Sequence, residues 1–267
     1  MYIVESVDEG ARIERKTDVP ETAAQMRWAG VAEGQAVLDL GCAAGTTTRI
    51  LGDVVGPTGR VLGVDASVAR TDEARAHPHH RPWIEYRAGT AEQIPAADGE
   101  FDVAWSRFLF EYVRHPADAM REMVRVTRRG GVVAVADLDG NCVWHDPMPD
   151  DFAREMSAAL ETLRPHGFDP YVGRRLFGLA KEAGLSDIRI DVQPYHVLAG
   201  RIDDERYAQW EMKIRAVTDT LASLGWTRER ASDLFERFMA HLRDEDTFTY
   251  STLISVSGIV PIQDGPA

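Results

Sequence analysis

The sequence predicts an α/β fold in which a mostly parallel, seven-stranded sheet is flanked by helices. Short runs of β-branched residues alternate with helical stretches through the first half of the chain, a pattern typical of parallel strands joined by crossover helices. Residues 36–40 are apolar apart from one aspartate, as expected of a strand covered on both faces. With 267 residues, 44% of them hydrophobic, the chain can bury a full core, and we expect one domain.

Start and stop signals define the first helix. Asp18 with Glu21 three residues on, and Pro20 between them, is typical of a helix start. This helix runs to Trp28, and Gly30 ends it.

Glycines end the later helices in the same way. The helix that begins at Ala44 stops at Gly56, the pair Gly130–Gly131 ends the helix before the fifth strand, and Gly184 ends the helix before the sixth. The predicted strands cover residues 36–40, 60–65, 83–88, 101–106, 132–138, 187–192 and 247–260, and these later helices cover residues 44–55, 68–76, 117–129 and 173–183.

Two stretches stand outside the alternation. Residues 140–171 follow the fifth strand and residues 201–246 follow the sixth, and we expect both insertions to be helical and to form a substrate cap, with residues 1–35 as an N-terminal lid and helix. Apolar residues at helical spacing on either side of Gly225 predict a helical hairpin in the second insertion. These stripes either pack on the main core, which is usual for apolar helix faces, or face the cofactor.

Composition limits the partners and the compartment. A formal net charge of −13 gives no general positive field, so we expect neither a nucleic-acid nor a membrane partner. Two cysteines, a polar N-terminus and the lack of a long apolar run favour a reduced, cytoplasmic setting. A monomer or a homodimer is compatible with the sequence.

Small residues follow the first strand, and an aspartate follows the second. Gly41, Ala43 and Gly45 let the backbone approach a ligand closely, and the next helix presents free N–H groups. Asp65 lies about twenty residues downstream, the arrangement that holds the hydroxyls of a ribose. Together these features indicate a nucleoside.

The loops after the third and fourth strands belong to the same predicted site. The carboxyl ends of parallel strands meet at one edge of a sheet, so residues just past each strand are expected close together. We therefore predict cofactor contacts from Asp39, Gly41, Cys42, Ala43, Gly45, Asp65, Ala66, Thr90, Ala91, Glu92 and Ser106.

Five segments between residues 37 and 138 form a recognisable set: VLDLGCAAG, VLGVDAS, GTAEQIP, FDVAWSRFLFEYV and VTRRGGVVAVADL. In these segments the chain resembles the class I methyltransferases that use S-adenosylmethionine, particularly the small-molecule enzymes related to those of quinone biosynthesis. The resemblance implies a Rossmann-like fold, S-adenosylmethionine as cofactor with S-adenosylhomocysteine as product, and methylation of a small apolar or aromatic acceptor at oxygen, nitrogen or carbon.

Two positions depart from the family pattern. Ala43 stands where the family usually has glycine, which the turn accepts if the alanine φ is negative. Thr90 stands where the family usually has an aspartate near the adenine amino group, and its hydroxyl can still accept a hydrogen bond from an amine.

The alternatives are an NAD(P)-dependent oxidoreductase and a nonenzymatic nucleoside-binding protein. A dinucleotide fingerprint would place small residues at Gly41, Ala43 and Thr46, yet threonine fills the last position and the glycine falls at Gly45. Bulky insertions over an intact cofactor site argue against a purely structural protein.

Candidate acid–base residues follow the fourth and fifth strands. His145 is the leading base and Glu111 the second candidate, because each lies past a strand on the expected pocket side. The alternative interpretation of His145 is a loop histidine that is hydrogen-bonded to the backbone. The alternative for Glu111 is a residue that caps a helix or pairs with Arg114. Tyr195 and His196 are a third option, although strand alternation points only one of them inward.

Aromatic residues near the expected mouth favour an apolar or planar acceptor. Arg107 pairs with a substrate anion, with the cofactor carboxylate or with an acidic neighbour such as Glu111; the sequence leaves this open. The predicted substrate residues are Arg107, Phe108, Trp144, Tyr195 and Trp210.

No metal is predicted. His77, His79 and His80 lie around prolines in what is predicted to be a solvated loop. Asp139 and Asn141 are similar to magnesium ligands of catechol-type methyltransferases, but the fourth strand lacks the further carboxylate that those enzymes require.

Overall fold

The computed structural model describes residues 14–15 and 17–262, except for the side chains of residues 141 and 142. The N-terminal lid expected within residues 1–35 falls partly on residues 1–13 and 16, which lie outside this description.

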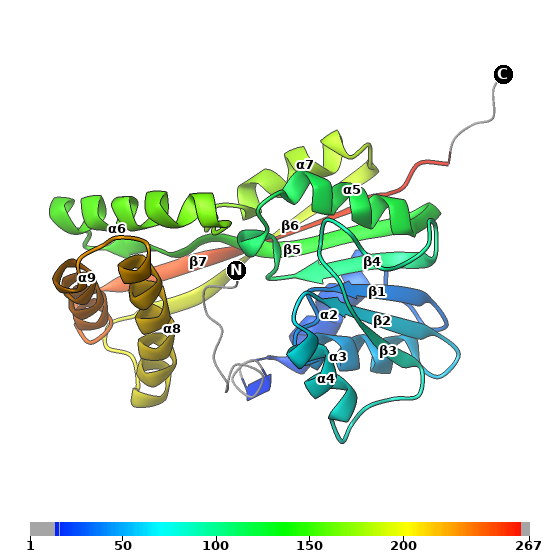
Figure 1. Cartoon of the computed structure of the whole chain (residues 1–267), viewed down its shortest axis with the longest axis horizontal. Coiled ribbons are helices and arrows are strands. Elements are labelled where there is room, and N and C mark those ends of the chain that lie inside the picture. The colour runs from blue at the N-terminus through cyan, green and yellow to red at the C-terminus, as the bar shows by residue number, and fades with distance from the viewer. Residues whose placement is uncertain (1–13, 16, 263–267) are drawn as a thin grey trace.

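The described chain forms one seven-stranded sheet with strand order β3-β2-β1-β4-β5-β7-β6 (Figure 1). The first five strands are parallel, and β7 runs antiparallel to both β5 and β6. This confirms the predicted fold class. The strands are β1 (Ala36–Leu40), β2 (Arg60–Asp65), β3 (Ile84–Ala88), β4 (Phe101–Arg107), β5 (Thr127–Asp146), β6 (Ser186–Ala199) and β7 (Phe248–Ile259).

Helices cover both faces of the sheet, and each face has its own apolar core. Helices α2 (Val19–Ala29), α3 (Thr46–Val55) and α4 (Val68–Ala76) pack on one face. Helices α5 (Pro116–Val126) and α7 (Leu176–Glu182) pack on the other. Burial on both faces explains why the central strands are continuously apolar.

Capping residues set most of the predicted helix ends. The Asp18 side chain accepts a 2.9 Å hydrogen bond from the Glu21 amide, and Gly30 ends α2 in the left-handed conformation, as expected. Helix α3 begins two residues later than predicted, because Gly45 itself is left-handed at φ +80° and forms its N-cap.

Two glycines expected to end α5 lie inside a strand instead. The helix stops at Val126 and the chain enters β5 at Thr127, so the predicted end of the helix at residue 129 was three residues too late. A Cβ on Gly131 would lie 2.7 Å from the Asp102 carbonyl oxygen, which shows that this glycine allows close approach of two strands.

Strands β5 and β6 run well beyond their predicted ends. In the outer half of the sheet, Trp144 pairs with Tyr250 and His145 with Thr249 across β5 and β7, and Leu198 of β6 pairs with Thr249 from the other side. The first part of the expected insertion at 140–171 is therefore strand.

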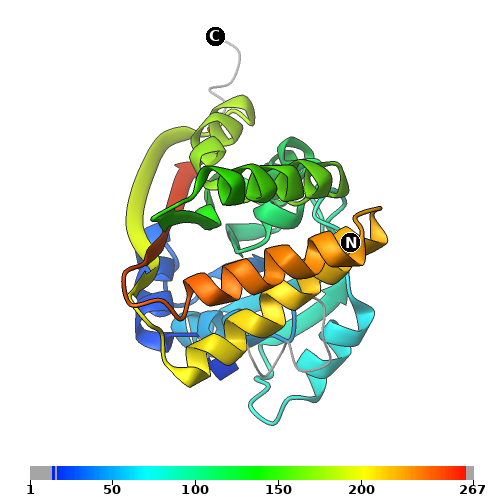
Figure 2. The same ribbon diagram turned by 90° about the vertical axis from the view of Figure 1, so that its left-hand side faces the viewer.

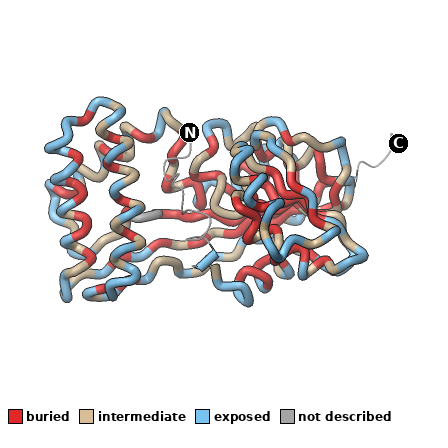
Figure 3. The backbone as a smooth tube through the Cα atoms, turned by 60° about the horizontal axis from the view of Figure 1, so that its bottom comes forward, coloured by how far each residue is buried: buried red, intermediate tan, exposed pale blue. Residues whose placement is uncertain are grey.

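A helical unit packs on these outer strands (Figures 1 and 2). It comprises α6 (Asp150–Leu163), α8 (Asp204–Ser223) and α9 (Arg228–His241), so helical insertions do follow the fifth and sixth strands. Residues such as Trp210, Leu221 and Phe238 form an apolar core separate from that of the sheet, and Figure 3 shows buried chain in both regions. The expectation that the apolar stripes pack on the main core was wrong.

Candidate active site

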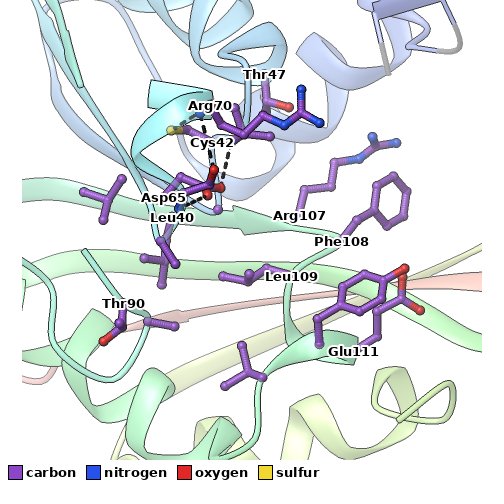
Figure 4. A pocket seen from close by; sticks show the side chains of 18 of the residues that line it. Leu40, Cys42, Thr47, Asp65, Arg70, Thr90, Arg107, Phe108, Leu109 and Glu111 are labelled. Carbon is purple, nitrogen blue, oxygen red and sulfur yellow. Dashed lines mark hydrogen bonds between the residues drawn. The ribbon is translucent and has the colours of Figure 1, made fainter. Parts of the chain in front are cut away.

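A cavity of about 620 Å³ opens at the carboxyl ends of the parallel strands and reaches to β6 and α8. Figure 4 shows Asp65 and Cys42 on one side of it and Arg107, Phe108 and Glu111 on the other. The predicted residues that line it are Gly41, Cys42, Ala43, Asp65, Ala66, Thr90, Ala91, Glu92, Arg107, Phe108, Glu111 and Tyr195.

Two residues of the loop after β1 have a left-handed backbone. Gly41 has φ +84°, and a Cβ there would lie 3.1 Å from the Leu109 side chain. Ala43 has φ +44°, so the condition of a negative φ is not met and its Cβ is held in the left-handed region.

Asp65 is held in place by two backbone amides. The Ala43 N–H donates to Oδ2 and the Ser67 N–H donates to Oδ1, each at 2.9 Å (Figure 4). Each carboxylate oxygen has further lone-pair capacity for a ligand hydroxyl.

Three predicted cofactor residues lie behind the cavity wall. Asp39 is buried, and the Thr48 hydroxyl donates to its Oδ2 at 2.7 Å. Burial raises the pKa of the Asp39 carboxyl to about 7, a shift that the Thr48 bond opposes and the Asp65 charge increases. Gly45 packs against Tyr86, and the Ser106 hydroxyl donates to the Leu40 carbonyl at 3.0 Å.

Glu111 lies in the short 3₁₀ turn η1 (Phe110–Tyr112), where it is buried and lines the cavity. Its backbone N–H donates to Oδ2 of Asp137 at 3.2 Å. Burial raises the pKa of Asp137 well above its usual range, and the neighbouring charge of Glu111 raises it further.

Arg107 is already engaged by its neighbours. Its Nε donates to Oε1 of Gln25 at 3.1 Å, and its guanidinium lies 4.1 Å from the centre of the Phe108 ring. Burial lowers the pKa of this guanidinium.

The structure places His145, Trp144 and Trp210 away from this cavity. His145 and Trp144 line a second cavity of about 380 Å³ against α6. His145 Nδ1 lies 2.8 Å from the Thr249 hydroxyl, and Trp210 is buried in the core of the helical unit. The sequence expectation was wrong for these three positions. Trp144 and His145 lie on β5, which continues as a strand where a loop was predicted, and Trp210 of α8 packs into the separate core of the helical unit.

Both Tyr195 and His196 line the cavity, although they are consecutive in β6. The register of β6 against β7 shifts between Tyr195 and Leu198, and His196 has φ +49°. A bulge of this kind turns two adjacent side chains to one side, so the expectation that only one points inward was wrong.

Backbone strain gathers at the cavity. Among the described residues the non-glycine positions with positive φ are Ala43, Phe108, Asp187 and His196, and all but Asp187 line it. Each such position costs on the order of 1–3 kcal/mol and is found mainly where function requires it.

Sequence reasoning missed several residues of the cavity. Leu109 and Tyr112 lie in the same loop as Phe108 and Glu111, so extending the prediction along that loop would have found them. His166 and Lys213 come from distant elements, and no local signal marks them. The missed lining residues with charged, polar or aromatic side chains include Thr17, Arg70, Tyr112, Arg114, His166 and Lys213.

Comparison with known proteins identifies the family. The model of a methyltransferase domain matches residues 38–135. A 2-phytyl-1,4-beta-naphthoquinone methyltransferase of Arabidopsis thaliana is 34% identical over 176 residues, which cover 60% of this chain and 67% of that protein. The chain belongs to the class I S-adenosylmethionine-dependent methyltransferases.

A longer relative of this methyltransferase occurs in Streptomyces fradiae. The 37.1 kDa protein in transposon TN4556 is 30% identical over 228 residues, or 84% of this chain. The methyltransferase spans 62% of the length of that relative.

Solved structures share the methyltransferase fold. A SAM-dependent methyltransferase from Aquifex aeolicus has a TM-score of 0.51 at 21% identity over 71% of this chain and 88% of its own. The Haemonchus contortus phosphoethanolamine N-methyltransferase 2 in complex with S-adenosyl-L-methionine has a TM-score of 0.58 at 17% identity, covering 91% of this chain and 53% of its own. Nothing in these comparisons supports the oxidoreductase alternative.

The described part of this methyltransferase contains no helix with the length and apolar character needed to cross a membrane. Asp139, considered above as a metal ligand, forms an ion pair with Arg174 at 2.7 Å.

Proposed function

We propose that this chain transfers a methyl group from S-adenosylmethionine to a small planar organic acceptor, at oxygen, nitrogen or carbon. One observation carries the proposal: a single cavity joins the loops of the cofactor motifs to an aromatic wall formed by Phe108, Tyr112 and Tyr195. Its volume of about 620 Å³ lies in the range of about 300–1,000 Å³ usual for small-molecule sites.

The residues present fit the cofactor. At Gly41 a Cβ would crowd the cavity against Leu109, and the Asp65 carboxylate is held by two amides. We propose that backbone groups of residues 41–44 hold the methionine end, that Asp65 holds the ribose hydroxyls, and that Thr90, Ala91 and Glu92 contact adenine. Bound S-adenosylmethionine supplies an electrophilic methyl group on a positively charged sulfur.

The protein contributes position and a proton acceptor. Holding the acceptor in the cavity beside the cofactor brings the nucleophile into line with the methyl group, which supplies much of the rate. Glu111 and Asp137 form a buried carboxyl pair, and two neighbouring carboxyls do not both ionise readily. We propose that Asp137 keeps a proton and that Glu111, which lines the cavity, accepts the proton of the acceptor.

The relatives support a quinone-like acceptor. Besides the Arabidopsis thaliana protein, a demethylmenaquinone methyltransferase of Paenarthrobacter aurescens is 34% identical over 132 residues. We propose that the acceptor has a quinone-like ring system. We further propose that the protein acts in the cytoplasm as a monomer or homodimer, without a nucleic-acid or membrane partner. The net charge of −13 supports the absence of these partners, and the two cysteines support a reduced, cytoplasmic compartment.

Calorimetry with S-adenosylhomocysteine tests the proposal. We expect saturable binding heat with S-adenosylhomocysteine and none with NADH. A screen of hydroxylated naphthalenes and quinols with radiolabelled S-adenosylmethionine should then find transfer to at least one ring. Absence of S-adenosylhomocysteine binding would rule out the proposed function.

A further inference from the structure

Basic side chains line the end of the cavity that lies away from the cofactor motifs. Arg114, His166 and Lys213 are all lining residues, in a chain whose net charge is −13. Neither composition nor the cofactor explains why these basic side chains line this end of the cavity.

The fold brings Arg114 and His166 together from segments 52 positions apart in the sequence. His166 ends the turn η2 (Arg164–His166), and the next residue, Gly167, packs on the chain leading to Arg114. A Cβ on Gly167 would lie 3.2 Å from the Tyr112 carbonyl oxygen and 3.5 Å from the Arg114 nitrogen. The close approach and the φ of +97° both favour glycine at this position.

A backbone hydrogen bond and a ring contact join the same two segments. The Asp169 N–H donates to the Glu111 carbonyl at 2.8 Å, and the rings of Tyr112 and Phe168 lie 5.7 Å apart. The segment carrying His166 is therefore tied to the segment carrying Arg114.

Lys213 approaches from a third element, helix α8. Its Nζ lies 5.0 Å from the centre of the Trp210 ring, and Trp210 is buried in the core of the helical unit. Trp210 also packs edge-on to His196, at 5.1 Å between ring centres. These contacts fix the turn of α8 from which Lys213 faces the cavity.

Two of these basic residues have no acidic partner among the described residues: no ion pair joins Arg114 or His166 to a carboxylate there. Glu111 is the acidic lining residue on this side, whereas Asp65 and Glu92 belong to the cofactor loops.

We propose that the methyl acceptor carries an oxyanion, a carboxylate or a phosphate, which Arg114, His166 and Lys213 bind together. This inference rests on the proposed function and names the substrate class for it. Guanidinium, imidazole and ammonium groups all donate hydrogen bonds to oxyanions, and such charge-assisted bonds are stronger than neutral ones. An anion held here links the sheet to the helical unit and leaves the rest of the acceptor beside Phe108 and Tyr195.

The test compares a carboxylate with an amide of nearly the same shape, and adds a phosphate on the same ring system. Hydroxynaphthoate, hydroxynaphthamide and naphthyl phosphate are titrated by calorimetry, with and without S-adenosylhomocysteine. At least one of the two anions should bind about tenfold or more tightly than the amide, and the stronger of them identifies the oxyanion. Equal binding of acid, phosphate and amide overturns the inference, as does failure of both anions to bind at millimolar concentration.

Variants locate the anion site. Arg114→Met with Lys213→Met keeps the aliphatic stems and should reduce the preference for the anion to about threefold or less. Lys181→Met is the matched control, because Lys181 is an exposed lysine that also lies over a ring, 5.6 Å from Phe177. A preference that survives the double substitution overturns the inference. Binding of S-adenosylhomocysteine is measured separately, so failure of the proposed function and failure of the oxyanion site are distinguished.

Discussion

The backbone amide of Ala43 donates a 2.9 Å hydrogen bond to the carboxylate of Asp65, and this bond joins the loop after β1 to the loop after β2. The Ser67 amide binds the other oxygen of the same carboxylate at 2.9 Å. Asp65 therefore orders both loops of the proposed cofactor site in addition to facing the cavity.

Replacement of Asp65 by alanine should weaken S-adenosylhomocysteine binding by about tenfold or more, since it removes a charged acceptor from the cavity and loosens both loops. Calorimetry measures the change. Asp72→Ala is the control, because Asp72 lies on α4, is exposed and does not line the cavity. Equal affinities of Asp65→Ala and the wild-type protein would contradict the assignment.

Ala43→Gly should raise the free energy of unfolding by about 0.5–1 kcal/mol. The left-handed backbone costs alanine about 1–2 kcal/mol, and the greater freedom of glycine in the unfolded chain offsets part of the gain. The neighbouring substitution Ala44→Gly is the control: Ala44 is buried and has no positive φ, so the protein should lose stability. Urea denaturation of both variants compares them, and an Ala43→Gly protein less stable than wild type would show that the strain is not there.

As pH rises, the free energy of unfolding of the wild-type protein should fall relative to that of the Asp39→Asn variant. Its pKa is raised from 3.8 to about 7 by burial, so the folded state favours the protonated form; the resulting stabilisation is complete below pH 3.8 and lost as pH rises through 7. Between pH 5 and pH 8 the shift in the difference should be about 1–3 kcal/mol in favour of the asparagine variant. Urea unfolding at several pH values measures it, with exposed Asp53→Asn as control. A difference that does not change with pH would refute the prediction.

Gly45→Ala should destabilise the protein by about 2–4 kcal/mol, because the new Cβ would overlap the Tyr86 hydroxyl and take a left-handed φ of +80°. Combining it with Tyr86→Phe should recover part of this loss, since the hydroxyl is removed but the ring carbon Cζ still lies 2.9 Å from the new Cβ. Gly178→Ala is the control: nothing lies within 4 Å of its would-be Cβ, and alanine is favoured in a helix. Additive effects in a double-mutant cycle would show that Gly45 and Tyr86 do not interact.

Glu111→Gln should lower the rate of methyl transfer by about 100-fold or more for an acceptor that must lose a proton, while S-adenosylhomocysteine affinity stays unchanged. His145→Ala should leave the rate nearly unchanged, because His145 lies at the second cavity and contacts Thr249 and Phe238. Rates are compared under single-turnover conditions with the acceptor found by the screen. If His145→Ala alone lowered the rate, the general base would be His145, as expected from the sequence, and not Glu111.

Local signals in the sequence located the elements that carry the cofactor motifs. Strands β1 and β2 and helix α4 have the predicted bounds. Asp18 and Gly30 cap α2 as expected. These features depend on neighbours within a few residues, such as caps, glycine stops and apolar runs, so the chain specifies them without reference to the rest of the fold.

Contacts across the sheet decided the acceptor side of the cavity. No sequence signal near Asp146 indicates that β5 continues to this residue. The outer half of β5 is held by pairing with β7, which lies more than a hundred residues later in the chain. That pairing carries Trp144 and His145 away from the cavity, and the bulge in β6 turns both Tyr195 and His196 toward it.

The sequence by itself determined the family, the sheet and the cofactor loops, since residues that follow parallel strands must meet at one edge of the sheet. Only the tertiary structure decided which side chains face the acceptor. Arg114, His166 and Lys213 come from three separate segments, and they line one cavity because the helical unit packs on the outer strands and the segment after α6 is tied to the turn at Glu111. Such long-range packing depends on the whole fold, and sequence spacing does not encode it.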